Sequence, residues 1–394
     1  MVLWVDKHRP KSLDALDYHQ PLSQQLKRMV SAGDLPHTLL YGPSGAGKKT
    51  RIMAMLREIH GPSVERLRVE QRTFKRDNGA DIELTLVASN HHLEFNPSDA
   101  GIRDREVVQE IIKEVASSGP VLIGGGSQGK ADFKVIVLNE VERMSKPAQH
   151  ALRRTMEKYT ASCRLILCCT NPSQVIAPIR SRCVCLRIAA PTHDEMCGVL
   201  SAVAKKEGLI LPPQLARKIS ESSERNLRRA LLTLEACKVQ QYPFSEQQHV
   251  QKPDWQLFIA GVVDDALAEQ SPKQLLKIRT KLYELLSNCI PPDLIMRTLV
   301  RQVRCSCAFP LPLVEREPSV EQHSETRPLC SDSLPHASQL LTKLPIPVRM
   351  ETLHHAALYE HRMRAGSKPI FHIEAFLARF MSCYKKYAVA NFGK

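Results

Sequence analysis

The glycine-rich stretch GPSGAGKKT, residues 42–50, has the residue types and spacing of a phosphate-binding loop, G-x-x-x-x-G-K-[ST]. Its backbone N–H groups would turn toward phosphate oxygens, and Lys48 would reach the β- and γ-phosphates of a nucleotide. The last position, which normally carries a hydroxyl for Mg²⁺, is Lys49. Thr50 comes one residue late, about 100° further around the following helix. We expect the nucleotide to contact Gly42, Pro43, Ser44, Gly45, Ala46, Gly47, Lys48, Lys49 and Thr50.

A second metal-binding position is also altered. In phosphate-binding-loop domains an Asp that ends an apolar strand helps to hold Mg²⁺, but the run 135–138 is followed by Asn139 and Glu140. Asparagine is neutral and replaces a carboxylate poorly as a ligand of Mg²⁺. Glu140 stands where a water-activating base belongs, and we interpret it as vestigial. We therefore predict binding of ATP or ADP with poor hydrolysis, and we regard Mg²⁺ coordination as doubtful.

Short apolar runs that alternate with helical patterns surround these residues. Residues 37–61 read as strand, turn and helix, and the runs 134–138 and 164–169 are typical of buried parallel strands. Apolar residues between 107 and 115 recur at helical spacing. This alternation predicts an α/β domain with a parallel sheet, which we place at residues 1–188.

The strand patterns stop near residue 190. Three short amphipathic segments predict a small helical domain at 189–250, and longer helical patterns predict an all-α domain at 254–394. Residues 305–338 are Pro-rich and have no sustained period, which predicts a disordered insertion. Translated non-coding sequence is the alternative explanation of this block.

Composition limits the classes of protein that this chain can represent. It has 394 residues and a formal net charge of +14, which favours an anionic partner such as nucleic acid. No apolar run is long enough for a transmembrane helix, and the first residues do not resemble a secretory signal. The 12 cysteines include no C-x-x-C pair, so we expect no zinc site, no other metal site and a reduced intracellular location.

Five segments in order make the chain resemble a known family. LWVDKHRP, GPSGAGKKT, ALRRTMEKY, SRC and NLRRAL resemble the small subunits of eukaryotic replication factor C, the sliding-clamp loader. The resemblance is closest to the subunit with KKT in its loop, runs from Leu3 to about residue 300, and resumes near Leu344. It implies an AAA+ domain, a helical lid and a helical collar for oligomerisation. It also implies nuclear localisation, no membrane, and three partners: other replication factor C subunits, a ring-shaped clamp and primer-template DNA.

The resemblance implies roles for several residues. Arg182 in the SRC segment would be an arginine finger in a neighbouring subunit's ATP site, with a surface salt bridge as the alternative. Arg228 would contact the chain's own nucleotide from the lid. Thr170 stands where the family has its polar sensor, and Asn171 comes one residue later, which again argues against hydrolysis in this chain. The residues expected on the adenine side are Val5, Arg9 and Pro10.

Two further contacts follow from the resemblance. Arg103, Arg105 and Lys113 correspond to the region that faces the DNA backbone, although a solvated charged face is nearly as good an interpretation. The apolar run 121–123 fits the clamp-contacting element, with a loop of no function as the alternative.

Two other functions compete with a weakly catalytic clamp-loader subunit. A freestanding ATPase or kinase of the phosphate-binding-loop class is disfavoured by Lys49 and Asn139. A subunit of an alternative checkpoint clamp loader remains open, because such complexes share small subunits.

Overall fold

The computed structural model describes residues 2–31, 35–76, 79–117, 133–160, 162–246, 248–306, 346–366 and 368–392. The chain forms two compact units, residues 1–251 and 252–394. The predicted clamp contact at 121–123 lies outside the described residues. So does the predicted insertion at 305–338, apart from two residues that end a helix.

A seven-stranded sheet forms the centre of the first unit. Its order is β2-β3-β4-β5-β6-β1-β7, and the five strands from β4 to β7 in this order are parallel. The parallel sheet was predicted, but the antiparallel hairpin of β2 and β3 on β4 was not. The strands are β1 Thr38–Tyr41, β2 Arg68–Arg76, β3 Gly79–Ala88, β4 His92–Phe95, β5 Lys134–Leu138, β6 Cys163–Cys169 and β7 Val184–Arg187.

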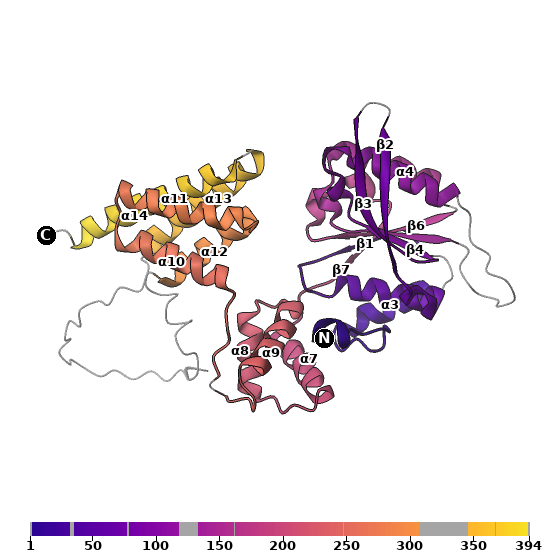
Figure 1. Ribbon diagram of the computed structural model, residues 1–394, viewed down its shortest axis with the longest axis horizontal. Helices are drawn as coiled ribbons and strands as arrows, with labels where there is room; N and C mark the ends of the chain where they lie inside the picture. Colours follow the sequence, from indigo (N-terminus) through magenta and orange to yellow (C-terminus); the bar gives the residue numbers. More distant parts are fainter. Residues whose placement is uncertain are drawn as a thin grey trace, which may run out of the picture. The chain divides into compact units, whose positions relative to one another are not determined.

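Alternate residues of the central strands face two separate hydrophobic cores, because side chains along a strand point to opposite faces. One face packs against α4 and α5 through Leu39, Ile136, Leu138, Leu165 and Leu167. The other face packs against α2 and α3 through Leu40, Val135, Val137, Ile166 and Cys168. Figure 1 shows α3 and α4 on opposite sides of the sheet. The helices of this layer are α2 Gln20–Ser31, α3 Lys48–His60, α4 Asp104–Ser117, α5 Lys146–Lys158 and the short α6 Ala177–Arg180.

The ends of these helices follow from local residues. Gly61 ends α3 with a φ of 80°, which glycine adopts readily. Ser145 caps α5 by accepting a hydrogen bond from the backbone N–H of Ala148. Its own N–H and hydroxyl donate to the buried carboxylate of Asp104 in α4, over 2.6 Å and 2.8 Å. Four short 3₁₀ turns, η1 Pro62–Glu65, η2 Pro97–Arg103, η3 Val141–Arg143 and η4 Pro172–Gln174, connect these elements.

Three helices form the lid, as predicted: α7 His193–Lys206, α8 Pro213–Ser222 and α9 Leu227–Gln240. Thr192 and Glu195 form a capping box at the start of α7. The N-terminal helix α1 Trp4–Lys7 joins the lid core through the buried Trp4. Lys7 also forms a 2.6 Å ion pair with Glu207, just after α7.

The second unit is all helical over its described residues. Its helices are α10 Asp254–Ala268, α11 Pro272–Ser287, α12 Pro292–Ser306, α13 Ile346–Ala365 and α14 Pro369–Phe392. They enclose one core that includes Ile259, Leu282 and the aromatic rings of Phe376 and Phe380. Among the described residues of the chain, no helix is long and apolar enough to cross a membrane.

Candidate nucleotide site

The carboxyl ends of parallel strands and the loop after β1 border a cavity of about 540 Å³ in the first unit. Ligands bind at this edge in open α/β sheets, because the loops that follow the strands converge there. The described residues that line the cavity are Ser44, Lys48, Lys49, Thr85, Val87, Glu94, Phe95, Asn96, Asp99, Asn139, Glu140, Glu142, Cys168, Cys169, Thr170 and Arg228.

Gly42, Gly45 and Gly47 of the loop stand where an added Cβ would lie closer than 3.0 Å to another residue. A Cβ on Gly42 would lie 1.9 Å from the carbonyl oxygen of Ile188, and one on Gly45 would lie 1.9 Å from Oδ1 of Asn226. Gly45 also has a φ of +75°. Its carbonyl accepts a 3.3 Å hydrogen bond from the N–H of Leu227, at the start of α9. The loop therefore touches the lid directly.

The loop rests on residues that the sequence did not single out. Arg51, in the first turn of α3, is completely buried and donates from Nη1 to the carbonyl of Ala46 and from Nη2 to that of Tyr18. The Tyr18 hydroxyl donates to the same Ala46 carbonyl over 3.0 Å. Nζ of Lys48 donates to the carbonyls of Gly42 (2.7 Å) and Pro43 (2.9 Å). The hydrogen bonds of Arg51 and Tyr18 become visible only in the folded structure, since these two residues are 33 positions apart in the sequence.

The residues at the usual metal positions have other partners. Nζ of Lys49 forms an ion pair with Oε1 of Glu94, and Nδ2 of Asn139 donates to the same oxygen over 2.7 Å. The Thr50 hydroxyl accepts a 3.2 Å hydrogen bond from Nε of Arg9. Mg²⁺ requires oxygen ligands in near-octahedral geometry, and this set offers an ammonium group in their place. These residues do not fit Mg²⁺. No sequence pattern had indicated Glu94 as part of this site.

The predicted water-activating position is occupied by a carboxylate with a partner of its own. Glu140 adopts a left-handed φ of 51° and forms a 2.9 Å ion pair with Arg143. Glu142 accepts hydrogen bonds from the N–H (2.9 Å) and the hydroxyl (2.6 Å) of Thr170. Thr170 lines the cavity, whereas Asn171 caps the turn η4 by accepting from Ser173.

The residues expected to contact the nucleotide from outside the loop lie in the lid and near the N-terminus. Arg228 is exposed, lines the cavity and belongs to the first turn of α9. Val5 packs against the lid core, and Arg9 and Pro10 are half-buried just after α1. Burial is the main cause that lowers the pKa of Arg9, which nevertheless stays charged because free arginine has a pKa above 12.

Arg182 is not among the described residues that line this cavity. Its Nη2 forms a 2.6 Å ion pair with Glu157 on α5, and its Nη1 donates to the carbonyl of Pro178. Arg153, also on α5, lies with its Nε 3.5 Å from the same Glu157 carboxylate. Arg154 is exposed. Both alternatives for Arg182, a salt bridge and a group that serves another chain, are compatible with this position.

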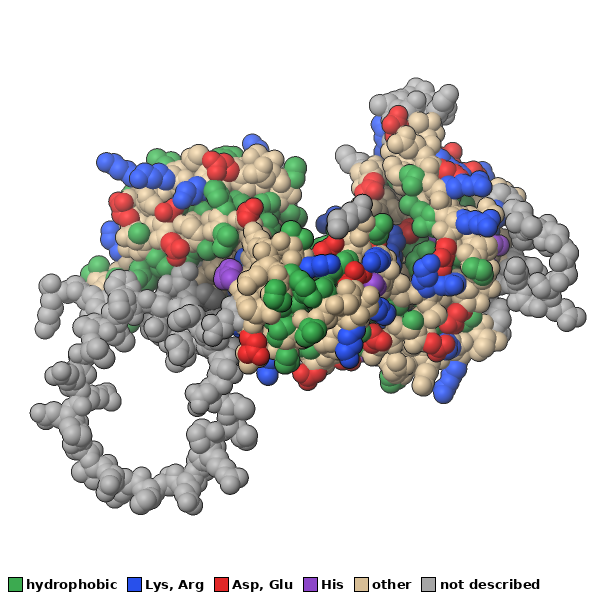
Figure 2. All heavy atoms as spheres, turned by 60° about the horizontal axis from the view of Figure 1, so that its bottom comes forward, with side chains coloured by type: hydrophobic (Ala, Val, Ile, Leu, Met, Phe, Trp, Pro, Cys, Tyr) green, Lys and Arg blue, Asp and Glu red, His purple; other side chains and the backbone are tan. Residues whose placement is uncertain are grey.

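Arg105 and Lys113 are exposed on α4, and Arg103, at the end of η2, is half-buried. Exposed carboxylates, Glu106 and Glu110 among them, lie on the same helix. On the face drawn in Figure 2, Lys and Arg side chains are interspersed with Asp and Glu. The DNA contact of Arg103, Arg105 and Lys113 therefore stays a prediction.

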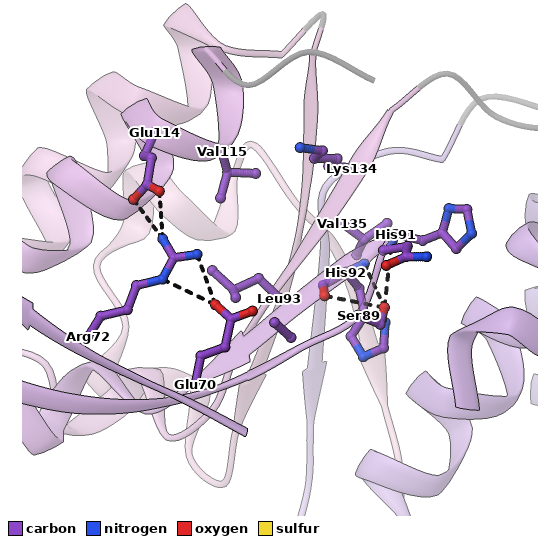
Figure 3. A pocket seen from close by; sticks show the side chains of 12 residues that line it. Glu70, Arg72, Ser89, His91, His92, Leu93, Glu114, Val115, Lys134 and Val135 are labelled. Atoms are coloured by element: carbon purple, nitrogen blue, oxygen red, sulfur yellow. Dashed lines mark hydrogen bonds and ion pairs between the residues drawn. The ribbon is translucent and has the colours of Figure 1, made fainter. Parts of the chain in front are cut away.

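A smaller hollow of about 150 Å³ lies beside β2, β4 and α4. Figure 3 shows Arg72 between Glu70 and Glu114, and its guanidinium bonds to both carboxylates. Burial lowers the pKa of His92 to about 4, so its ring is neutral at physiological pH. The arginine of this hollow is therefore paired and His92 is neutral, and Lys134 also lines it. Among the described residues, no group of His, Cys, Asp and Glu is arranged to hold a metal ion.

Three models of known protein families match different parts of the chain. A family model of the RCF1/5-like AAA+ ATPase lid domain matches residues 198–239. A model of the replication factor C subunit 3 C-terminal domain matches residues 255–313 and 337–388. A model of the DNA polymerase III delta subunit matches residues 18–192. Together these matches cover most of the chain.

Relatives match the chain over its whole length. Replication factor C subunit 3 of Arabidopsis thaliana is 48% identical over 395 residues, which covers 100% of both chains. Replication factor C subunit 3 of Homo sapiens is 48% identical over 387 residues, or 98% of this chain and 97% of its own. A solved structure, the Thermotoga maritima RuvB Holliday junction branch migration motor, matches with a TM-score of 0.41 and 19% identity over 59% of this chain and 65% of that one.

Proposed function

This chain belongs to the replication factor C family and is a clamp-loader subunit, and we propose that it binds a nucleotide, hydrolyses it poorly and assists a neighbouring subunit's ATP site. The AAA+ fold and the role in DNA replication follow from family membership. Other replication factor C subunits are its partners.

The observation that carries the proposal is the set of partners at the two metal positions. Lys49 and Asn139 both bond to Glu94, and the nearest hydroxyl, that of Thr50, accepts from Arg9. Hydrolysis by this class of site uses Mg²⁺ to neutralise the charge that develops on the phosphates. The loop keeps Lys48 and its glycines, which favours binding of ATP or ADP without efficient turnover.

Arg182 supplies the catalytic contribution that this chain makes to another site. Its place outside the lining of the chain's own cavity supports a role in trans. Its guanidinium has a side-chain exposure of 35%, so another chain can reach it. In other NTPases an arginine finger raises the rate of hydrolysis by roughly 10³–10⁵.

The clamp, primer-template DNA and nuclear localisation complete the proposal. Arg103, Arg105 and Lys113 contact the DNA backbone, and 121–123 contacts the clamp. The domain boundaries that we propose are 1–188, 189–250 and 254–394, with an insertion at 305–338. The family model of the C-terminal domain supports this last assignment, because it matches residues on both sides of 314–336.

Hydrolysis by the isolated chain tests the proposal. The full-length chain, purified alone, is expected to bind labelled ADP or ATP and to show negligible ATP hydrolysis with or without primer-template DNA. Turnover is measured as phosphate release in the presence of Mg²⁺. Robust metal-dependent turnover by the isolated chain would contradict the proposal and favour a freestanding ATPase.

A further inference from the structure

Three side chains from distant parts of the sequence meet at the cavity, at the place where other phosphate-binding-loop domains hold Mg²⁺. Lys49 comes from the first turn of α3, Glu94 from β4, and Asn139 follows β5. Lys49 and Asn139 both bond to Oε1 of Glu94, and all three residues line the cavity. Both residues at altered metal positions, Lys49 and Asn139, therefore bond to the carboxylate of Glu94.

The burial of the two charged partners differs. The Glu94 side chain is 5% exposed, whereas the Lys49 side chain is 44% exposed. A carboxylate at that depth is costly unless a cation and hydrogen bonds compensate it, and Lys49 with Asn139 provide both. An ammonium group has three donors. After one of them bonds to Glu94, two remain for a ligand that enters the cavity.

A divalent cation has no place beside this group. Protonated Lys49 has no lone pair to donate to a metal, and its positive charge repels one. Nδ2 of Asn139 faces Glu94 as a donor, so this hydrogen bond orients the amide. The residues therefore do not fit Mg²⁺, but they do place a positive charge close to Lys48, its neighbour in the loop.

We propose that Lys49, held by Glu94 and Asn139, is a built-in cation that takes the place of Mg²⁺, so that this site binds a nucleoside diphosphate or triphosphate in its metal-free form. This inference rests on the proposal that the loop binds a nucleotide. Lys48, Lys49 and the N–H groups at the start of α3 then neutralise the phosphates without a metal.

Nucleotide binding with and without metal tests the inference directly. Fluorescently labelled ADP is titrated with the full-length chain in a millimolar excess of Mg²⁺ and, separately, in excess EDTA. The expected dissociation constants differ by less than about twofold. Binding that weakens at least about tenfold in EDTA overturns the inference but leaves nucleotide binding intact. No binding in either buffer overturns both proposals, so the two failures are distinguishable.

Two double variants test the role of Lys49. Lys49→Thr with Asn139→Asp restores both metal ligands, and its ADP affinity is expected to become at least about tenfold higher in Mg²⁺ than in EDTA. Lys49→Met with Glu94→Gln removes the ion pair at constant net charge, and its metal-free affinity is expected to fall about tenfold. Equal metal-free affinity of this variant and the wild type overturns the inference.

A matched control removes an ordinary surface ion pair. Lys27 pairs with Asp14 in the first unit, away from the residues that line the cavity. Lys27→Thr is expected to leave ADP affinity and its response to Mg²⁺ unchanged. Circular dichroism confirms that each variant is folded before its binding is compared.

Discussion

At the scale of single residues, the two lysines of the loop have different partners. Lys48 bonds to the loop carbonyls of Gly42 and Pro43, whereas Lys49 bonds to the buried Glu94. The loop pattern predicted the position of Lys48 at the start of α3 and the unusual residue at position 49, and the role of Lys48 at the phosphates stays a prediction. It could not predict Glu94, because this residue reaches the site only through the pairing of β4 with β5.

Cys183 lies next to the proposed arginine finger, and the reactivity of its thiol depends on burial. Burial raises the pKa of its thiol from an ordinary 9 to about 12. The thiolate is the reactive form, so Cys183 is expected to resist iodoacetamide at pH 8 in the folded protein. Exposed Cys185, two residues away, serves as the internal control and is expected to be alkylated. Peptide mass spectrometry measures both.

The raised pKa of Cys183 also makes the stability of the protein depend on pH. Below pH 9 the thiol is protonated in both states, and between about 9 and 12 only the unfolded state releases the proton. The contribution of Cys183 to stability is therefore present below pH 9 and lost as the pH rises toward 12. Alkylation of Cys183 at the rate of Cys185 in the folded protein would contradict this prediction.

At the scale of elements, apolar runs and helical spacing predicted the elements that hold the loop. Residues 134–138 and 164–169 form β5 and β6, and the helix after the loop ends before Gly61 as expected. The hairpin of β2 and β3 was missed, since charged residues interrupt its pattern and its pairing to β4 depends on tertiary contacts. The dipeptide Asn78-Gly79 is a hairpin signal that could have indicated it.

The contact between the loop and the lid gives a prediction at this scale. Gly45→Ala places a Cβ at a φ of +75° and against Asn226, so it is expected to cost about 1–3 kcal/mol of stability and at least about tenfold in ADP affinity. Gly61→Ala has a similar φ of +80° with nothing within 4 Å of the new Cβ. It isolates the backbone strain from the clash.

Denaturant unfolding and ADP titration are measured for both glycine variants. Gly61→Ala is expected to lose about 1–3 kcal/mol of stability, because φ 80° with ψ −170° is a conformation that essentially only glycine adopts, and to keep its affinity. If the two variants lose affinity equally, the close approach of Gly45 to the lid is not what the nucleotide site depends on.

At the scale of the whole molecule, the chain consists of two units that carry different features. The first unit carries the loop, the lid and Arg182, and the second forms a separate helical core. The second unit exposes large hydrophobic side chains, including Leu276, Met350 and Phe371, which favours contact with other subunits. The ion pair of Arg182 with Glu157 does not oppose a role in trans, because an exposed pair is worth only about 0–1 kcal/mol.

The domain order could be predicted from the sequence because strand patterns end near residue 190 and only helical patterns follow. The role of Arg182 in a neighbouring subunit's site was predicted only through the family resemblance and stays a prediction, because its proposed target belongs to another chain. Family membership shows that other replication factor C subunits are partners of this chain. That its own site contributes little turnover stays a proposal, which rests on Lys49 and Asn139.

The most direct test compares Arg182→Ala with Lys48→Ala in reconstituted assemblies in which one other subunit at a time keeps an intact phosphate-binding loop. The measured quantity is the steady-state rate of ATP hydrolysis on primer-template DNA with the clamp present. For one neighbour, Arg182→Ala is expected to lower the rate at least about 100-fold, whereas Lys48→Ala changes it less than about threefold. A large loss with Lys48→Ala and none with Arg182→Ala in every assembly would contradict the account.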